Sequence, residues 1–277
     1  MNILFEDRAM LISSGETTAL VIADIHLGYE VALSERTNVS FPPQNMTMVK
    51  RIEDLVHSYN VTDLFLLGDI KHTISPDKHY NWSVIPQFVA RLAQLTNITI
   101  VPGNHDGDLK NLLPRGIELS SIRGVIHETA GKKIALLHGH AWPASELLNC
   151  QLMLVGHNHP SIRRMKVVST PNLERRDKLR SAKSMPIFLK SKLDRACVRK
   201  KLGLPESDKK GVQIMVTLPS FNELVLGIQI NRPDARLLGP LFENNCSDLL
   251  SAIVYSNNGI NLGSVEELQS RFSESFP

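Results

Sequence analysis

The stretch TTALVIADIHLGYE, residues 17–30, joins an apolar run to two metal-binding side chain types, Asp24 and His26. The run is short, rich in β-branched residues and stops at a polar residue, which predicts a strand buried on both faces. Four further apolar runs end in the same way, at a glycine or a polar side chain. They are DLFLLGD (63–69), NITIVPGN (97–104), KKIALLHGH (132–140) and QLMLVGH (151–157).

Amphipathic patterns between these runs predict helices over residues 45–59 and 84–95. Strands that alternate with helices indicate an α/β layered fold with a largely parallel first sheet. After about residue 160 the pattern favours a second, more antiparallel sheet. Its expected strands are 162–168, 186–190, 212–218 and 224–230, with a basic helix over 191–202. We predict one domain over residues 1–277, with a basic excursion at about 163–210.

Composition excludes several classes of protein. Of the 277 residues, 42% are hydrophobic and 21% charged, which excludes wholesale disorder. No apolar run approaches the ~20 residues that span a bilayer, and the start MNILFEDRAM lacks the features of a signal peptide. These features predict a cytoplasmic protein without a membrane partner. Cys150, Cys197 and Cys246 are far apart with no CxxC pair, so we expect three thiols rather than a disulfide framework or a zinc site.

The net charge of +3 is unevenly distributed along the chain. Residues 163–210 hold 16 Lys and Arg against 5 Asp and Glu. Such a segment is typical either of a solvated surface or of a face that binds nucleic acid or another anionic partner. The segment contains one aromatic residue, Phe188, which argues against base stacking as the mode of binding.

The strand ends carry the chemistry of this sequence. Ligands of open α/β sheets gather at the carboxyl ends of the strands, so the side chains there should converge. Carboxylate, imidazole and amide groups are the donors that divalent metals use. Seven such donors exceed what one tetrahedral ion needs and suit two ions that share a carboxylate, for which Asp69 is the natural bridge. The seven are Asp24, His26, Asp69, Asn104, His138, His157 and His159.

The motifs D-x-H, GD, GNHD, HGH and GHxH, in this order, resemble the calcineurin-like metallophosphoesterase superfamily. The resemblance covers roughly residues 5–268. It is extended by LGDIKH, HGHAWP, GHNHP, PIFLKSKL, LPSFNELVLG and GINLGSVEEL, which are similar to archaeal phosphoesterases related to the double-strand-break-repair nuclease. Bacterial phosphoesterases encoded beside a DNA ligase belong to the same wider group. The resemblance implies two packed mixed β-sheets flanked by helices.

The resemblance also implies a role for each strand-end residue. Asp24, His26 and His159 would hold a first ion, Asn104, His138 and His157 a second, and Asp69 would be shared. His105 would face the scissile phosphate, and Asp106 would orient His105. All seven ligand positions are present, which implies an active hydrolase with two divalent metal ions, and Mn²⁺ is the expected metal.

Three more residues are candidates for substrate binding. Many superfamily members carry an acidic or aromatic residue after the GD motif, whereas this chain carries Ile70, Lys71 and His72, as the archaeal subgroup does. Lys71 and His72 would place a cation and an imidazole where they can grip a phosphate. The alternative for Lys71 is a side chain that points to solvent. His140 has two possible roles. It either touches the substrate or only forms a hydrogen bond behind the metal ligands.

The expected function is metal-dependent hydrolysis of phosphodiester bonds in nucleic acid. The basic segment and the resemblance to repair nucleases favour this substrate, and the resemblance suggests a DNA-repair protein as partner. The first alternative is a phosphatase or phosphodiesterase for nucleotides or other small phosphoesters. The second is a non-catalytic scaffold, which loss of metal ligands or of His105 would mark.

Overall fold

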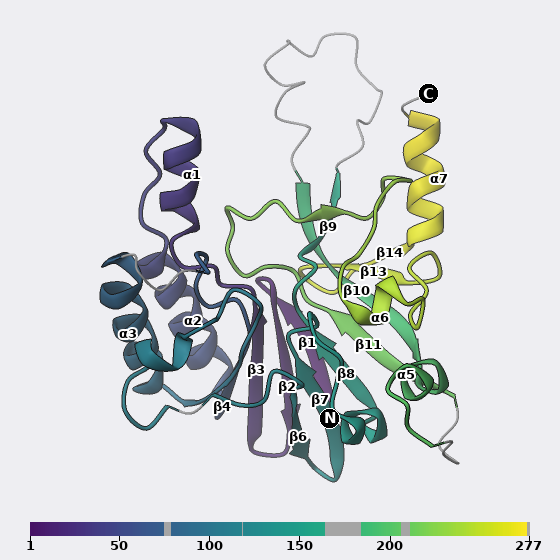
Figure 1. Cartoon of the computed structure of the whole chain (residues 1–277), viewed down its shortest axis with the longest axis horizontal. Coiled ribbons are helices and arrows are strands. Elements are labelled where there is room, and N and C mark those ends of the chain that lie inside the picture. Colours follow the sequence, from purple (N-terminus) through teal and green to yellow (C-terminus); the bar gives the residue numbers. More distant parts are fainter. Residues whose placement is uncertain (75–78, 118, 164–183, 206–210, 276–277) are drawn as a thin grey trace.

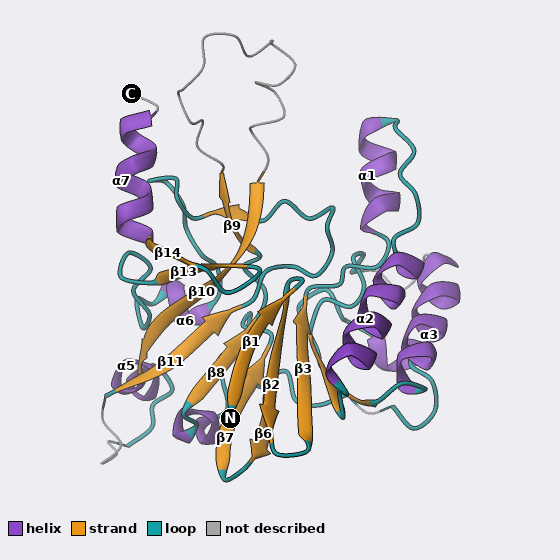
Figure 2. Ribbon diagram, turned by 180° about the vertical axis from the view of Figure 1, so that it is seen from behind, coloured by secondary structure: helices purple, strands orange, loops and turns teal. Residues whose placement is uncertain are grey.

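Two β-sheets are stacked face to face between two layers of helices (Figure 1). The computed structural model describes residues 1–74, 79–117, 119–163, 184–205 and 211–275. Helices α2 and α3 lie along the first sheet, and α5, α6 and α7 lie on the side of the second, as Figure 2 shows from behind. The α-helices are α1 (Tyr29–Thr37), α2 (Asn45–Tyr59), α3 (His79–Ala93), α5 (Arg195–Lys201), α6 (Pro240–Glu243) and α7 (Val265–Ser275).

The first sheet has the strand order β1-β2-β3-β4-β5. Strands β3, β4 and β5 are parallel to one another, and β1 and β2 continue the sheet in antiparallel pairing. The register aligns the last residues of the parallel strands, Ala23, Leu67 and Val101. The strands are β1 (Asn2–Glu6), β2 (Ala9–Ser14), β3 (Thr17–Ala23), β4 (Asp63–Leu67) and β5 (Asn97–Val101).

The second sheet has the order β12-β9-β10-β11-β8-β7-β6, with β13 paired to β10 and β14 to β13. Strands β7, β8 and β11 are parallel, so the ends of β7 and β8 coincide at Leu137 and Val155. The strands are β6 (Val125–Thr129), β7 (Lys132–Leu137), β8 (Leu152–Val155), β9 (Pro160–Arg163), β10 (Ser184–Asp194), β11 (Val212–Thr217), β12 (Ile228–Gln229), β13 (Ile253–Ser256) and β14 (Asn261–Ser264). Two 3₁₀ helices, Leu109–Leu112 and Ser145–Asn149, complete the described elements.

Alternating residues of the buried strands supply different layers of the core. In β3, Val21 faces the second sheet, where Leu136 and Leu154 pack in the same cluster. Its neighbour Ile22 faces the other way, into the cluster that the helices α2 and α3 cover. Because both faces of these strands are buried, their sequences are continuous apolar runs rather than alternating ones. The core therefore holds the strand ends rigidly at one edge of each sheet.

The predicted architecture of two mixed sheets flanked by helices is confirmed, with corrections to its parts. The strands over 132–137 and 152–155 belong to the second sheet, not to the first. The predicted helix over 191–202 is wrong at its start, because residues 191–194 continue β10, which pairs with β11. Helix α3 begins earlier than predicted, at His79. Part of the expected strand 162–168 and most of the link from 169 to 185 lie outside the described residues.

The expectation of three thiols is also wrong. Cys197 on α5 and Cys246 after α6 form a disulfide, while Cys150 is buried and takes no part in it. The two cysteines are 49 positions apart in the chain, so the sequence alone does not show that they are neighbours. Within the described part of the chain, no helix is both long and apolar enough to cross a membrane. One domain over 1–277 with a basic excursion stays a prediction.

Candidate metal centre

The ends of four strands from both sheets meet at one place. Asp24 follows β3 and Asp69 closely follows β4, and the amide of Asp24 donates to the carbonyl of Gly68 at 3.2 Å. His138 follows β7, and its carbonyl accepts from the amide of Gly156 after β8 at 2.9 Å. Through these two hydrogen bonds, the loops after the strands stay side by side as the strands themselves do. The loops of the two sheets therefore face each other across one site.

Left-handed backbone conformations are concentrated at this site. Five of the predicted ligands have positive φ angles, which are uncommon for residues other than glycine and cost of order 1–3 kcal/mol each. The angles are 57° at Asp24, 46° at His26, 50° at Asp69, 69° at His157 and 44° at His159. Such strain persists only where the surrounding structure enforces it, and its concentration on five side chains of metal-binding type marks the site as functional.

Four ligand atoms form a compact first set. His159 Nε2 lies 3.1 Å from Asp24 Oδ1 and 3.3 Å from His26 Nε2, and His26 Nε2 lies 3.7 Å from Asp69 Oδ2. An ion with four ligands at about 2.1 Å keeps neighbouring ligand atoms roughly 3.4 Å apart. The observed spacings match this figure. The donor set of two carboxylates and two imidazoles therefore fits one divalent metal ion.

A second set of donors adjoins the first. His138 Nε2 lies 3.2 Å from Asn104 Oδ1 and 3.5 Å from Asp69 Oδ1. The Nδ1–H of His138 donates to the carbonyl of Leu67 at 3.0 Å, which directs the lone pair of Nε2 toward these oxygens. The ring of His157 lies 5.0 Å from the ring of His138, between centroids. The residues predicted for a second ion are thus brought together, with His157 at the margin of the set.

Asp69 stands between the two sets, with Oδ2 toward His26 and Oδ1 toward His138. Its Oδ1 also accepts a hydrogen bond of 2.9 Å from the amide of His105. Gly103 leaves the room that this carboxylate needs, because a Cβ atom there would collide with Asp69 Oδ1. The buried Asp69 side chain is therefore held in place from two loops while each oxygen faces a different donor set.

Burial and mutual proximity shift the ionisation of the cluster. Burial alone would raise the pKa of Asp24, but the surrounding imidazoles, led by His159, lower it to about 2. Burial raises the pKa of Asp69, an effect that His138 opposes and the Asp24 carboxylate reinforces. Burial, together with the neighbouring His138, lowers the pKa of His157 to about 4. A neutral His157 can offer a lone pair to a cation, which would also relieve the repulsion between the two carboxylates.

His105 and His72 lie beside the first set. The Nδ1–H of His105 donates to the backbone carbonyl of His72, which fixes the imidazole and leaves Nε2 available. The two rings are stacked with centroids 5.7 Å apart, and Tyr29 packs edge-on against His72 at 4.8 Å. His105 Nε2 lies 3.9 Å from Asp69 Oδ2. The structure thus brings His105 and His72 to the centre, as the sequence predicted.

Two predicted roles do not match the contacts. The Asp106 carboxylate accepts hydrogen bonds from the amides of Gly103 at 2.8 Å and Ile70 at 2.9 Å, so it joins two loops rather than orienting His105. Its burial raises its pKa to about 6. Lys71 is fully buried, and its ammonium donates to the carbonyls of Thr73 at 2.9 Å and Ile74 at 2.7 Å. The proposed grip of Lys71 on a phosphate is therefore not what its contacts show.

His140 lies next to two of the predicted ligands. Its ring is 5.1 Å from that of His138 and 6.2 Å from that of His157. Burial, reinforced by His138, lowers the pKa of His140 to about 4. The buried Nδ1 of His140 has no hydrogen-bond partner among the described residues, so both roles considered for His140 stay predictions.

Sequence reasoning gave no role to the residues that fix the metal loops from outside. Ser220 Oγ donates to the carbonyl of Asp24 at 2.7 Å, and Asn222 Nδ2 donates to those of Ile25 and His26 at 3.0 and 3.3 Å. Asn158 accepts from the amide of Leu238 at 2.6 Å. The signal for Ser220 and Asn222 was the segment LPSFNELVLG, whose polar residues interrupt an apolar stretch.

Comparison with known proteins identifies the family. Residues 17–197, more than half of the chain, match the model of the calcineurin-like phosphoesterases. The chain belongs to the calcineurin-like phosphoesterase family, and this membership makes it a phosphoric ester hydrolase. No curated protein matched the sequence.

Two solved structures are similar to the chain. A nuclease named MPE from Pseudomonas putida is 19% identical with a TM-score of 0.52, over 94% of this chain and 100% of the nuclease. An archaeal phosphodiesterase is 14% identical with a TM-score of 0.33, over 72% of this chain and 98% of the other. At these identities the first similarity concerns the fold alone.

Proposed function

We propose that this protein hydrolyses phosphodiester bonds in nucleic acid at a centre of two divalent metal ions. The observation that carries the proposal is the placement of Asp69, whose two carboxylate oxygens face two separate donor sets. Asp24, His26 and His159 would hold one ion, Asn104, His138 and His157 the other, and Asp69 both. Bound ions would supply Lewis acidity that polarises the phosphate and promotes ionisation of the attacking water.

The protein's own residues would assist the reaction from one side. His105 is fixed through Nδ1, so Nε2 can donate a proton to the leaving oxygen or stabilise charge on the phosphate. His72 stacks on His105 and supports its position. Asp106 would contribute indirectly, because its hydrogen bonds hold the loops that carry Asp69 and Asn104.

The basic composition of residues 163–210 supports nucleic acid as the substrate. The position of the described part of this segment gives less support. Asp194, at the end of β10, pairs with Val212 at the start of β11, whereas the metal loops follow the opposite ends of the parallel strands. The cations of α5 therefore lie away from the centre. Residues 164–183 and 206–210 of the basic segment lie outside the described residues.

The position of α5 favours a second candidate function, hydrolysis of nucleotides or other small phosphoesters. Such a substrate needs no extended basic surface beside the metals. A non-catalytic scaffold is the weakest of the three, since all seven ligand positions carry metal-binding side chains. Mn²⁺ as the metal, a cytoplasmic location and a DNA-repair partner are further proposals that rest on the sequence and its resemblance.

A screen of the purified protein tests these alternatives. With Mn²⁺ present, it compares a chromogenic phosphodiester, a phosphomonoester, cyclic nucleotides, and end-labelled DNA and RNA in single- and double-stranded form. The proposal expects cleavage of the diester and of at least one polymer. Turnover of the small esters alone would favour the second function, and no turnover of any ester would contradict both.

A further inference from the structure

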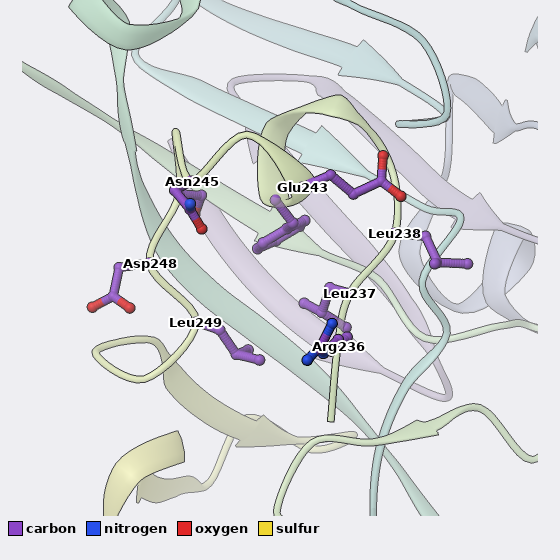
Figure 3. Close-up of a pocket in the computed structure, with 9 residues that line it drawn as sticks. Arg236, Leu237, Leu238, Glu243, Asn245, Asp248 and Leu249 are labelled. Carbon is purple, nitrogen blue, oxygen red and sulfur yellow. The ribbon is translucent and has the colours of Figure 1, made fainter. Parts of the chain in front are cut away.

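A hollow of about 580 Å³ opens beside helix α6, on the outer side of the second sheet. We call it the α6 hollow. Its apolar lining includes Leu237, Phe242 and Leu249, and its polar lining includes Arg236 and Glu243. Leu238 lies at one end of the lining and Asp248 at the other (Figure 3). Leu237 and Phe242 are nearly buried, but Leu238 exposes 49% of its surface, so an apolar side chain stands open at one end.

The end at Leu238 adjoins the metal centre. The amide of Leu238 donates to Asn158 Oδ1 at 2.6 Å, and Asn158 Nδ2 donates to the carbonyl of Leu238 at 3.2 Å. Asn158 is buried and lies in the chain between the predicted ligands His157 and His159. A Cβ atom on Gly239 would meet the carbonyl of Gly139 and would lie 3.5 Å from the His157 ring. The chain that forms this end of the hollow therefore packs directly on two metal loops.

The lining of the hollow indicates a ligand without net charge that has both apolar and polar surface. Its size lies in the range of sites for small organic molecules, roughly 300–1,000 Å³. The lining contains one positive charge, on Arg236, and two negative charges, on Glu243 and Asp248. It therefore does not favour a second phosphate. The Asp248 carboxylate accepts from the amides of Leu250 and Ser251, and the lining also holds the acceptor Glu243 and the donor Arg236. A nucleobase meets these requirements with its apolar faces and its donor and acceptor edge.

We propose that the α6 hollow binds the nucleoside attached to the phosphate that the metal centre cleaves. The proposal rests on the proposed function and narrows its substrates to esters that contain a nucleotide. Leu238 contacts the part of the nucleoside that lies nearest to the metal centre. Leu237, Phe242 and Leu249 pack against the base. Arg236 and Glu243 bind its polar edge. Because one nucleoside fills the site, a free nucleotide and a polymer can both use it.

Binding to the full-length protein without added metal tests the proposal directly. Calorimetry compares adenosine 5′-monophosphate with ribose 5-phosphate, which differ by the base alone. We expect the nucleotide to bind about tenfold more tightly, a difference of about 1.4 kcal/mol. Leu238→Ala and Arg236→Ala should each remove most of this preference. Leu250→Ala is the matched control, since Leu250 is 45% exposed in the same region but is not part of the lining, and it should keep the preference.

A kinetic arm separates this proposal from the proposed function. Leu238→Ala should raise KM about tenfold for the p-nitrophenyl ester of thymidine 5′-monophosphate. Its effect on KM for p-nitrophenyl methyl phosphate, which has no nucleoside, should be several-fold smaller. Equal binding of nucleotide and ribose phosphate, or equal behaviour of Leu238→Ala and Leu250→Ala, would overturn the hollow as a nucleoside site even with both esters cleaved. Failure to cleave either ester with Mn²⁺ would overturn the proposed function instead.

Discussion

The backbone N–H of His157 donates to the carboxylate of Asp24, at 3.0 Å from Oδ2 and 3.2 Å from Oδ1. Asp24 follows β3 of the first sheet and His157 follows β8 of the second, so this hydrogen bond joins the two sheets at the metal centre. An amide that donates to a buried carboxylate is a charge-assisted hydrogen bond and helps to fix the position of Asp24. The site is thus part of the contact between the sheets.

The contact predicts that Gly156, which precedes His157, tolerates no larger side chain. A Cβ atom there would lie 2.8 Å from Asp24 Oδ2 and 2.9 Å from Ala23 Cβ. Gly156→Ala should lower the free energy of unfolding by about 1–3 kcal/mol, the usual cost of overpacking, and should reduce metal content. Gly107→Ala is the control, because its Cβ atom would have open space. Denaturant unfolding and metal analysis check both variants, and equal behaviour of the two would contradict the close approach.

A second prediction concerns the corrected role of Asp106. If its carboxylate joins two loops through the amides of Gly103 and Ile70, Asp106→Asn leaves buried donors poorly matched. Unfolding free energy should fall by about 1–3 kcal/mol. Asp108→Asn, an exposed neighbour whose side chain caps no helix, should stay within about 0.5 kcal/mol of the unmodified protein. Unchanged stability of Asp106→Asn would show that these hydrogen bonds do not hold the loops.

The strands of the core and the donors at their ends could be predicted from sequence because each signal is local. An apolar run that stops at Asp24 or His138 is visible without any knowledge of its neighbours. The same runs look alike in either sheet, so the sequence could not assign β7 and β8 to the second one. The role of Lys71 could not be predicted for a related reason. Its position two residues after Asp69 does not reveal that its ammonium binds the carbonyls of Thr73 and Ile74 rather than a phosphate.

The third prediction separates chemistry from metal binding. His105→Ala should lower kcat roughly 10²–10⁴-fold, the usual contribution of a positioned acid–base group, while the metal content stays normal. His57→Ala, on the exposed face of α2, serves as the control and should leave both quantities unchanged. Steady-state kinetics with a chromogenic diester and metal analysis of the same preparations give the answer. Loss of a metal ion in His105→Ala would show that His105 is a ligand.

The fourth prediction tests nucleic acid as substrate. Neutralising Arg175, Arg176, Lys178 and Arg180, which lie outside the described residues, should weaken binding of DNA or RNA. Each lost phosphate contact should reduce the slope of log K against log salt by about 0.7–0.9. Turnover of a small chromogenic ester should barely change. Binding of labelled polymers at several salt concentrations provides the measurement.

A control with the same change in charge removes four exposed lysines on β10 and α5. They are Lys190, Lys192, Lys200 and Lys201. This variant should keep the salt dependence of the unmodified protein. Absence of polymer binding by the unmodified protein at low salt, together with no cleavage in Mn²⁺, would exclude the nuclease function and leave the small-phosphoester alternative.

The central claim, two metal ions that share Asp69, is tested most directly by a crystal structure with saturating Mn²⁺ and anomalous scattering data. The account predicts two anomalous peaks, one among Asp24, His26 and His159 and the other among Asn104, His138 and His157. Each peak should lie within bonding distance of one Asp69 oxygen. A single peak, or two peaks of which neither contacts Asp69, would contradict it.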